Sequence, residues 1–474
     1  MLLLPSSSAQ PESPAITDAG SGQRWSWVQL ESTVEAITAS LEASRKQLVF
    51  LLCRNDAATI LAYLASIEAG HAVALLDAAL SPEFQQRLIA LYTPDLLICS
   101  ASLDQPVDGY DFSTIWEHPA IHLGRRRVTP EGEIHPELAL LLSTSGSTGT
   151  PKFVRLTRGN VESNAHSIRE ALGITSDERP ISSLPIHYSY GLSVVNSHLA
   201  AGAELVLTHE GSTTAPFWEA FRNYRCTTFS GVPYSYQILQ RLDFEKLNVP
   251  SLTTLTQAGG KLHTDLVAKF HAMIARRGGR MFVMYGQTEA TARIAVVPAD
   301  RLIDKLGSAG RAIPDGSLSI RTEAGLTKEP GVTGEVVYSG PNVMMGYAQS
   351  RADLALGDTL SGCLNTGDVG YLDREGFLYL SGRQKRDAKV FGLRLNMDEI
   401  EDMMRLHGPT AVLSTGEKLI LFCEHGDAEL FSQYSRELSS KLKLHVSAFQ
   451  FRRVEQLPLN ANGKIDYGQL EGAL

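Results

Sequence analysis

Residues 141–152 read Leu-Leu-Ser-Thr-Ser-Gly-Ser-Thr-Gly-Thr-Pro-Lys, and this stretch is the most informative in the chain. The apolar run from Leu138 to Leu142 predicts a strand, which leads directly into a loop rich in glycine and hydroxyl residues. Glycines let backbone N–H groups converge on an anion, hydroxyls add donors, and a lysine supplies a positive charge. The stretch therefore predicts a phosphate-binding loop formed by Thr144, Ser145, Gly146, Ser147, Thr148, Gly149 and Lys152.

This loop differs from the phosphate loop of P-loop NTPases. That motif has four residues between its glycines and a Lys-Ser or Lys-Thr pair directly after the second one. Here two residues separate Gly146 from Gly149, and Phe153 follows Lys152. The P-loop class is therefore excluded, whereas a flexible Gly/Ser linker with a chance lysine stays open on this stretch alone.

Composition narrows the class of protein. The chain has 474 residues, enough for two or three domains, with 43% hydrophobic and 20% charged residues, as in soluble globular proteins. The formal net charge of −9 argues against a nucleic-acid partner, because phosphate backbones attract clustered Lys and Arg. Five cysteines without metal-ligand spacing favour a cytoplasmic protein with no structural zinc. We expect no membrane span, since no apolar run approaches the roughly 20 residues required.

Strands and helices alternate on both sides of the loop, after residues 1 to about 22, which we expect to form a loose arm. Before the loop, the pattern predicts a helix capped by Asp56, a helix that begins at Ser81-Pro82, and strands at 48–52, 73–76 and 96–99. After the loop, it predicts strands at 204–208, 227–230, 252–257 and 281–284, separated by helices at 216–224, 234–242 and 264–276. This alternation predicts an α/β protein with two αβα-layered halves, each on a parallel sheet.

The pattern changes after Gly307. Short strands separated by Gly, Pro and Asp turns predict a small β subdomain at about 307–380. A polar connector follows at 382–387, and residues 388–474 are expected to form a separate small α/β domain. The predicted organisation is a large N-terminal domain over 1–381, a hinge, and a C-terminal domain.

Four more motifs follow the phosphate loop in a fixed order. They are Met-Tyr-Gly-Gln-Thr-Glu at 284–289, Asn-Thr-Gly-Asp at 365–368, Ser-Gly-Arg at 381–383 and Pro-Leu-Asn-Ala-Asn-Gly-Lys at 458–464. Together with the loop, they resemble the adenylate-forming superfamily of acyl-CoA synthetases, peptide-synthetase adenylation domains and luciferases. The resemblance runs from about Trp25 to Lys464. It implies that a carboxylic acid reacts with ATP to give acyl-AMP and pyrophosphate, and that the acyl group then passes to a pantetheine thiol.

The resemblance also assigns roles around the nucleotide. It places Tyr285 on adenine, Thr288 at the α-phosphate and Glu289 on Mg²⁺, roles that suit an aromatic face, a neutral donor and a hard carboxylate oxygen. Asp368 and Arg383 match the ribose contacts. The remaining residues expected to contact adenine or AMP are Gly259, Gly260, Lys261, Gly286 and Gln287. Without the other motifs, residues 285–289 would fit a strand-to-helix cap and residues 259–260 a simple turn.

The acid pocket is expected around residues 185–191. His187 lies fifteen residues before Gly202, the spacing of the gating histidine in aryl- and acyl-CoA ligases, although a structural histidine is the alternative. Ser189 stands where many amino-acid-activating domains have the aspartate that binds the substrate ammonium. An unpaired ammonium in a half-buried pocket is costly, so we predict a fatty or aryl acid. The predicted pocket residues are His187, Ser189, Tyr190, Val232 and Gly260.

Three residues near the C terminus complete the predicted machinery. Lys464 matches the catalytic lysine, Lys385 the hinge, and Gly392 the loop presented to the thiol after the C-terminal domain rotates. The chain departs from the family pattern at Arg386, where an acidic residue is usual, at Ala388, where a branched aliphatic residue is usual, and at Asn460, where threonine is usual.

The resemblance leaves several functions open. The cofactors implied are ATP and Mg²⁺, with coenzyme A or a phosphopantetheinyl carrier protein as acyl acceptor. We expect no carrier domain after Leu474 and therefore expect a carrier protein to act in trans. The alternatives to an acid–thiol ligase are a stand-alone amino-acid adenylation enzyme, a catalytically inactive adenine-nucleotide-binding protein, and a luciferase-like oxygenase.

Overall fold

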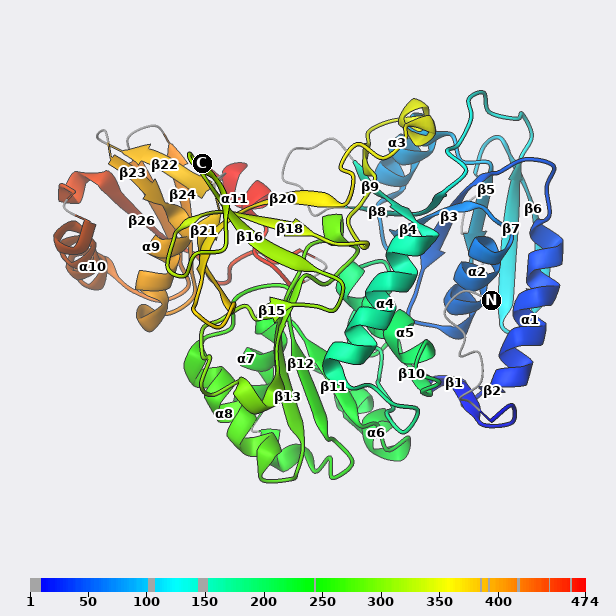
Figure 1. The fold of residues 1–474 in the computed structure, drawn as a ribbon, viewed down its shortest axis with the longest axis horizontal. Helices are drawn as coiled ribbons and strands as arrows, with labels where there is room; N and C mark the ends of the chain where they lie inside the picture. Colours follow the sequence, from blue (N-terminus) through cyan, green and yellow to red (C-terminus); the bar gives the residue numbers. More distant parts are fainter. Residues whose placement is uncertain are drawn as a thin grey trace. The chain divides into compact units, whose positions relative to one another are not determined.

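The computed structural model describes residues 10–100, 107–143, 152–242, 244–383, 386–390, 393–415, 418–442, 444–460 and 463–474. These residues form two compact units (Figure 1). The larger unit comprises three segments: the chain up to the phosphate loop, the chain after that loop as far as Ser317, and Ser339–Leu364. The smaller unit comprises Leu318–Tyr338 and the chain from Asn365 to Leu474.

An eight-stranded sheet forms the first half of the larger unit, in the order β19-β9-β8-β4-β3-β5-β7-β6. The central strands β8, β4, β3 and β5 are parallel, as predicted, but the outer strands pair antiparallel. The prediction of a parallel sheet is therefore wrong at the edges, where short connections join β6 to β7. The bounds are β3 Leu48–Cys53, β4 Ala72–Asp77, β5 Leu96–Cys99, β6 Tyr110–Glu117, β7 Ala120–Arg126, β8 Leu138–Ser143, β9 Phe153–Thr157 and β19 Gly346–Ala348.

Helices cover both faces of this sheet. Val49 and Leu51 of β3 point into a core shared with α1, α2, α4 and α5, whereas Phe50 and Leu52 point into a core shared with Leu88 of α3. Because successive strand residues face opposite sides, this division gives the predicted αβα layers. The helices are α1 Trp27–Leu41, α2 Ala57–Glu68, α3 Pro82–Tyr92, α4 Arg158–Leu172 and α5 Ser189–Leu199.

The second half of the larger unit has a five-stranded sheet, ordered β11-β12-β13-β14-β15. Strands β11, β12 and β13 are parallel, and β14 and β15 add antiparallel. The bounds are β11 Thr228–Gly231, β12 Thr254–Gln257, β13 Arg280–Tyr285, β14 Ala295–Val297 and β15 Arg311–Ala312, with helices α6 Ala215–Asn223, α7 Pro233–Arg241 and α8 Thr264–Ala275.

A third, small sheet corrects the expectation of a loose N-terminal arm. Strand β1, Pro14–Asp18, pairs parallel with β10, Leu205–Leu207, and antiparallel with β2, Arg24–Ser26. Ile16 is completely buried, and the Thr17 hydroxyl donates to the Glu204 carboxylate at 2.5 Å. The partner strand lies far away in the sequence, so local composition carried no sign of this pairing.

The smaller unit contains the predicted short strands and an α/β segment. One sheet has the order β17-β16-β18-β20-β21, and a second has the order β24-β25-β26. The bounds of the first are β16 Ser317–Thr322, β17 Gly325–Thr327, β18 Gly334–Ser339, β20 Cys363–Leu372 and β21 Leu378–Arg383. The later elements are β22 Asp387–Val390, β23 Leu393–Asn396, α9 Met397–Met404, β24 Thr410–Thr415, β25 Lys418–Cys423, α10 Ala428–Leu442, β26 Phe449–Arg453 and α11 Tyr467–Glu471. The α/β fold class is as predicted.

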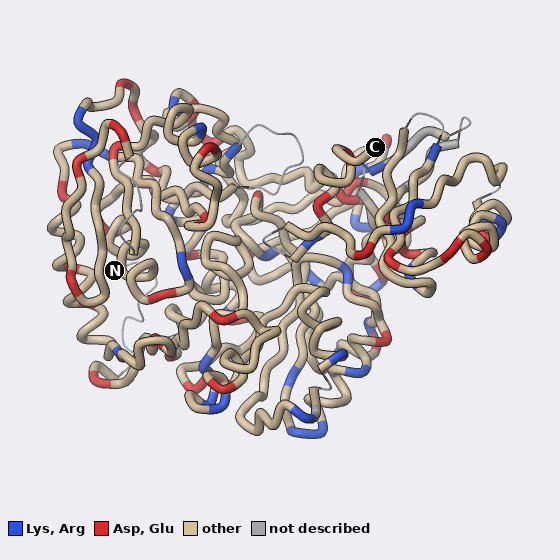
Figure 2. Tube along the Cα trace, turned by 180° about the vertical axis from the view of Figure 1, so that it is seen from behind, with Lys and Arg blue, Asp and Glu red and all other residues tan. Residues whose placement is uncertain are grey.

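Charged residues of both signs are interspersed along the chain trace in Figure 2. Among the described helices, none has both the length and the apolar character needed to cross a membrane.

Candidate active site

Part of the predicted site lies outside the described residues. These positions are Thr144, Ser145, Gly146, Ser147, Thr148 and Gly149 of the phosphate loop, Lys385 of the connector, and Gly392. For Arg383, the structure describes the backbone and not the side chain.

Three predicted segments lie at the carboxyl ends of the parallel strands β11, β12 and β13. They are Val232, residues 259–261 and residues 285–289, and ligands of open α/β sheets bind at this edge. The Gln257 amide donates to the Gly260 carbonyl at 2.8 Å, which holds the glycine turn. A Cβ at Gly260 would lie 3.1 Å from Pro233 Cγ, so this turn packs closely against Pro233, the residue after Val232.

The segment from Tyr285 to Glu289 folds back tightly after β13. The Gln287 amide donates to the Tyr285 hydroxyl at 3.3 Å, and the Ile294 N–H donates to the Tyr285 carbonyl at 2.9 Å. A Cβ at Gly286 would lie only 1.7 Å from the Ala292 carbonyl oxygen. Glycine is therefore required here by a close approach of two backbone segments.

The predicted acid pocket and the predicted α-phosphate residue are in direct contact. Ser189, the first residue of α5, has its hydroxyl 3.2 Å from the Thr288 hydroxyl. The next residue, Tyr190, has its hydroxyl 2.8 Å from that of Thr256 in β12. The Arg293 guanidinium lies 4.8 Å from the centre of the Tyr190 ring. Burial raises the pKa of Tyr190, so its phenol stays neutral.

His187 lies just before α5, and its Nε2 is 3.9 Å from the Asp77 carboxylate. Burial lowers the pKa of His187, and the neighbouring Asp77 opposes that shift. Asn55 holds the preceding loop by donating to the Leu184 carbonyl at 3.2 Å and accepting from the Ile186 N–H at 3.2 Å. The histidine is thus placed at the carboxyl end of β4, where Asp77 ends the strand.

Tyr347 joins two predicted phosphate- and metal-binding residues. The Lys152 ammonium lies 3.8 Å from the centre of the Tyr347 ring, and the Tyr347 hydroxyl donates to Glu289 Oε1 at 2.7 Å. Sequence reasoning missed this residue, as it missed Asp77 and Arg293. Tyr347 is 58 residues from Glu289, and no local pattern around it indicated a site.

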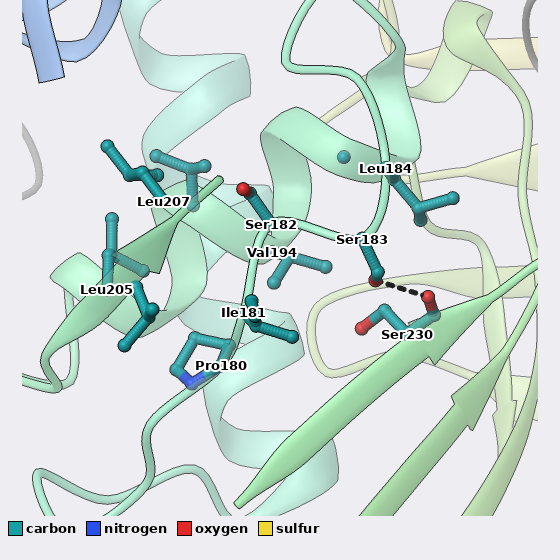
Figure 3. Close-up of a pocket in the computed structure, with 12 residues that line it drawn as sticks. Pro180, Ile181, Ser182, Ser183, Leu184, Val194, Leu205, Leu207 and Ser230 are labelled. Carbon is teal, nitrogen blue, oxygen red and sulfur yellow. Dashed lines mark hydrogen bonds between the residues drawn. The ribbon is translucent and has the colours of Figure 1, made fainter. Parts of the chain in front are cut away.

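A small cavity borders the predicted acid-pocket segment at Gly191. It lies between residues 180–184, α5 and β10, and Figure 3 shows its mostly apolar lining and the hydrogen bond from the Ser183 hydroxyl to the Ser230 carbonyl. Its volume of about 20 Å³ accommodates roughly one water molecule.

Asp368 and Arg383 are brought opposite each other in the smaller unit. They are register partners in the antiparallel pair β20 and β21, although fourteen residues separate them in the chain. Asp368 is buried, with 4% exposure, and its N–H donates to the Thr366 hydroxyl at 3.1 Å. The predicted ribose contacts therefore share one place on this sheet.

Lys464 lies at the end of a tight turn in the smaller unit. The Asn460 N–H donates to the Lys464 carbonyl at 2.8 Å, and the Lys464 N–H donates to the Asn460 side-chain oxygen at 3.1 Å. Gly463 has φ +69°, which is the conformation that glycine adopts without strain. The substitution of asparagine for the usual threonine at 460 therefore still provides an acceptor for this turn.

Comparisons with known proteins bear on the class of this chain. A family model described as AMP-binding enzyme matches residues 5–348. The chain is 30% identical over 354 residues to 2-succinylbenzoate–CoA ligase of Bacillus velezensis, an alignment covering 70% of each protein. It is 29% identical to indoleacetate–CoA ligase of Aromatoleum aromaticum, over 80% of this chain and 77% of that one. The o-succinylbenzoate CoA synthetase of Bacillus subtilis, solved with its acyl-adenylate intermediate, superimposes with a TM-score of 0.77 at 25% identity and covers 98% of this chain and 96% of its own.

Proposed function

Because this chain belongs to the family of AMP-binding enzymes, we propose that it activates an aryl carboxylic acid with ATP and transfers the acyl group to coenzyme A. The chain is an adenylate-forming acid–thiol ligase, with relatives that are named as CoA ligases. The proposal concerns the acid, the acceptor and the residues that carry each step.

One observation carries the proposal for the first step. The 3.2 Å contact between the Ser189 and Thr288 hydroxyls supports an acid pocket beside the segment proposed to bind the α-phosphate. A carboxylate bound there would lie next to the phosphorus that it must attack. Holding two reactants together in this way removes much of the entropic barrier of a bimolecular reaction.

Lys152, Lys464 and Glu289 are each proposed to act on a different charge that is present or develops during adenylation. The carboxylate oxygen attacks the α-phosphorus, the bond to the pyrophosphate oxygen breaks, and pyrophosphate leaves with that electron pair. Lys152 is proposed to neutralise the leaving phosphates, and Lys464 the charge developing between carboxylate and α-phosphate. Glu289 offers a carboxylate of the kind that Mg²⁺ prefers, and the bound ion would neutralise phosphate charge.

The acid pocket supports an aryl acid. Ser189 supplies a hydroxyl where a carboxylate would be needed to bind an α-ammonium group. Tyr190 and Val232 belong to one apolar core cluster, which suits a hydrophobic ring. The names of the relatives, 2-succinylbenzoate and indoleacetate ligases, point to the same class of acid.

The second step is proposed to use free coenzyme A. Its thiol attacks the carbonyl carbon of the acyl-adenylate, AMP leaves, and a thioester forms. We propose Lys385 as the pivot between the two steps and Gly392 in the loop that receives the thiol, on the strength of the family resemblance alone. A carrier protein in trans is the competing acceptor.

A screen of acids tests the proposal. Purified protein is incubated with MgATP and benzoates, indoleacetate, 2-succinylbenzoate, fatty acids or α-amino acids, with and without coenzyme A, and released pyrophosphate is measured. We expect aryl acids to give the fastest release and coenzyme A to yield an aryl-CoA product detectable by mass spectrometry. Absence of pyrophosphate release with every acid, or adenylation without any transfer to coenzyme A, would contradict the proposal.

A further inference from the structure

We propose that Tyr347 is a positioning residue that holds the Lys152 ammonium and the Glu289 carboxylate apart and in place for MgATP. The inference rests on the proposed function, because it assigns those two groups to phosphate and magnesium. Tyr347 itself touches neither reacting atom; it acts through the two charged residues that it contacts.

The two contacts use different parts of the tyrosine. The ring face receives the Lys152 ammonium at 3.8 Å from its centre, a cation–π contact. The hydroxyl donates to Glu289 Oε1 at 2.7 Å, a hydrogen bond strengthened by the negative charge of the acceptor.

The backbone of Tyr347 is anchored from several sides. Strand β19 pairs with β9, which begins one residue after Lys152, so that Tyr347 lies opposite Val154. Arg155 of β9 is 1% exposed and donates to the Tyr347 carbonyl and the Met345 carbonyl, both at 3.2 Å. A side chain on so rigid a strand can hold other groups at fixed positions.

Glu289 is tied to the same stretch of chain. The Met344 N–H donates to the Glu289 carbonyl at 2.9 Å, three residues before Tyr347. The carboxylate and the strand that carries Tyr347 are therefore linked through both backbone and side chain.

The arrangement has a consequence for charge. A lysine and a glutamate that pair directly neutralise each other, and each then offers less to a phosphate or a cation. With the ring contacting the ammonium and the hydroxyl contacting the carboxylate, each charged group has a neutral neighbour. Tyr347 thereby keeps positive charge available for phosphate oxygens and a carboxylate oxygen available for Mg²⁺.

Two variants separate the two contacts. Tyr347→Phe keeps the ring beneath Lys152 and removes the hydroxyl from Glu289, so the Mg²⁺ concentration for half-maximal pyrophosphate exchange should rise roughly ten- to hundredfold. The KM for ATP at saturating Mg²⁺ should stay within about twofold. Tyr347→Leu removes both contacts and should raise both quantities.

Two measurements distinguish positioning from a general structural effect. Thioester formation from supplied acyl-AMP and coenzyme A requires neither Mg²⁺ nor the triphosphate, so both variants should retain it. Tyr110→Phe is the matched control, because its hydroxyl donates to the Pro94 carbonyl at 2.6 Å in the β6 edge of the sheet, remote in sequence from every predicted site residue. That control should leave the Mg²⁺ requirement unchanged.

Calorimetric titration with ATP makes the test independent of turnover. We expect Tyr347→Phe to bind ATP as wild type does in EDTA and to gain less affinity on addition of Mg²⁺. An unchanged Mg²⁺ dependence in both Tyr347 variants would overturn the inference and leave the proposed function intact. If the wild-type protein activates no acid, the proposed function fails, but the ATP titration still tests the role of Tyr347. If the wild-type protein shows no Mg²⁺-dependent ATP binding, the inference about Tyr347 is overturned.

Discussion

Replacement of Gly286 by alanine tests whether residues 285–289 hold the nucleotide. The added Cβ would lie 1.7 Å from the Ala292 carbonyl oxygen, 2.7 Å from the Ala292 carbonyl carbon and 2.9 Å from Arg293 Cα. Ordinary contact begins at 3.4 Å, so the two backbone segments must separate by about 1.7 Å. Since the neighbouring atoms are backbone, no side-chain rotation can relieve the overlap.

The surroundings decide which segment moves. The Arg293 carbonyl accepts from the Asn164 amide at 3.2 Å and from the Asn342 amide at 2.8 Å, which holds the Ala292–Arg293 segment in place. The displacement should therefore fall on residues 286–289 and carry Thr288 and Glu289 with it. A misplacement of about 1 Å costs roughly 10²-fold in rate, and overpacking costs about 1–3 kcal/mol of stability.

The assay is acid-dependent exchange of pyrophosphate into ATP, with thermal unfolding measured on the same samples. Gly286→Ala should lose at least roughly 10²-fold in exchange while it remains folded. Gly159→Ala is the control: it lies in α4, its Cβ would meet only the Thr157 hydroxyl at 3.6 Å, and alanine favours a helix. A Gly286→Ala protein with wild-type exchange and wild-type unfolding temperature would refute the assignment of this segment.

Four further predictions concern other parts of the chain. Lys464→Ala should slow adenylation roughly 10²–10³-fold, while thioester formation from supplied acyl-AMP survives. Equal loss in both steps would contradict the proposal that Lys464 acts in adenylation alone. Aryl acids should outcompete α-amino acids in exchange, and a preference for an α-amino acid that persists in Ser189→Ala would show the pocket assignment wrong. Lys385→Pro should spare adenylation and abolish transfer to coenzyme A, because proline fixes φ and removes an N–H; full activity of both Lys385→Pro and Arg386→Pro would count against a rotating domain. His71 accepts from the Gln47 N–H, its Nε2 lies 2.8 Å from the Leu41 carbonyl oxygen, and burial lowers its pKa. The free energy of unfolding should therefore fall as the pH drops through 6.5, the ordinary pKa of histidine. Urea titrations of His71→Gln should show a shallower fall.

Local elements of the fold could be predicted because their signals are local. The strand at 48–52 and the helix capped by Asp56 appear at nearly those bounds, and the Asp56 carboxylate accepts from the Thr59 N–H at 2.8 Å. The β1–β10 pairing could not be predicted, since a strand of five residues beside Ser, Pro and Gly looks like an arm until its partner is known. The edge strand β6 and its neighbour β7 were likewise not predicted, because strand formation there depends on packing against adjacent strands more than on composition.

In the site, too, residues in local sequence motifs could be predicted, whereas residues that reach the site through tertiary contacts could not. The order of motifs identified the adenylate-forming family, and the comparisons confirm that resemblance. Parallel strands also explain why Val232, residues 259–261 and Tyr285 share one edge of a sheet. The supporting residues could not be found in this way, because Tyr347, Asp77 and Arg293 reach the site only through tertiary contacts.

Arg386 shows how the structure explains a departure from the family pattern. Its guanidinium pairs with the carboxylates of Asp398 and Glu401 in α9 and lies 4.0 Å from the centre of the Tyr467 ring, whose hydroxyl donates to Glu401 at 2.9 Å. An acidic residue at 386 would bring a third carboxylate next to the two on α9, whereas the arginine neutralises both of those carboxylates. Removing a partner from such an enclosed pair leaves an uncompensated charge, which is strongly unfavourable. Arg386 is thus fixed to α9 and α11, which supports Lys385 over Arg386 as the proposed pivot.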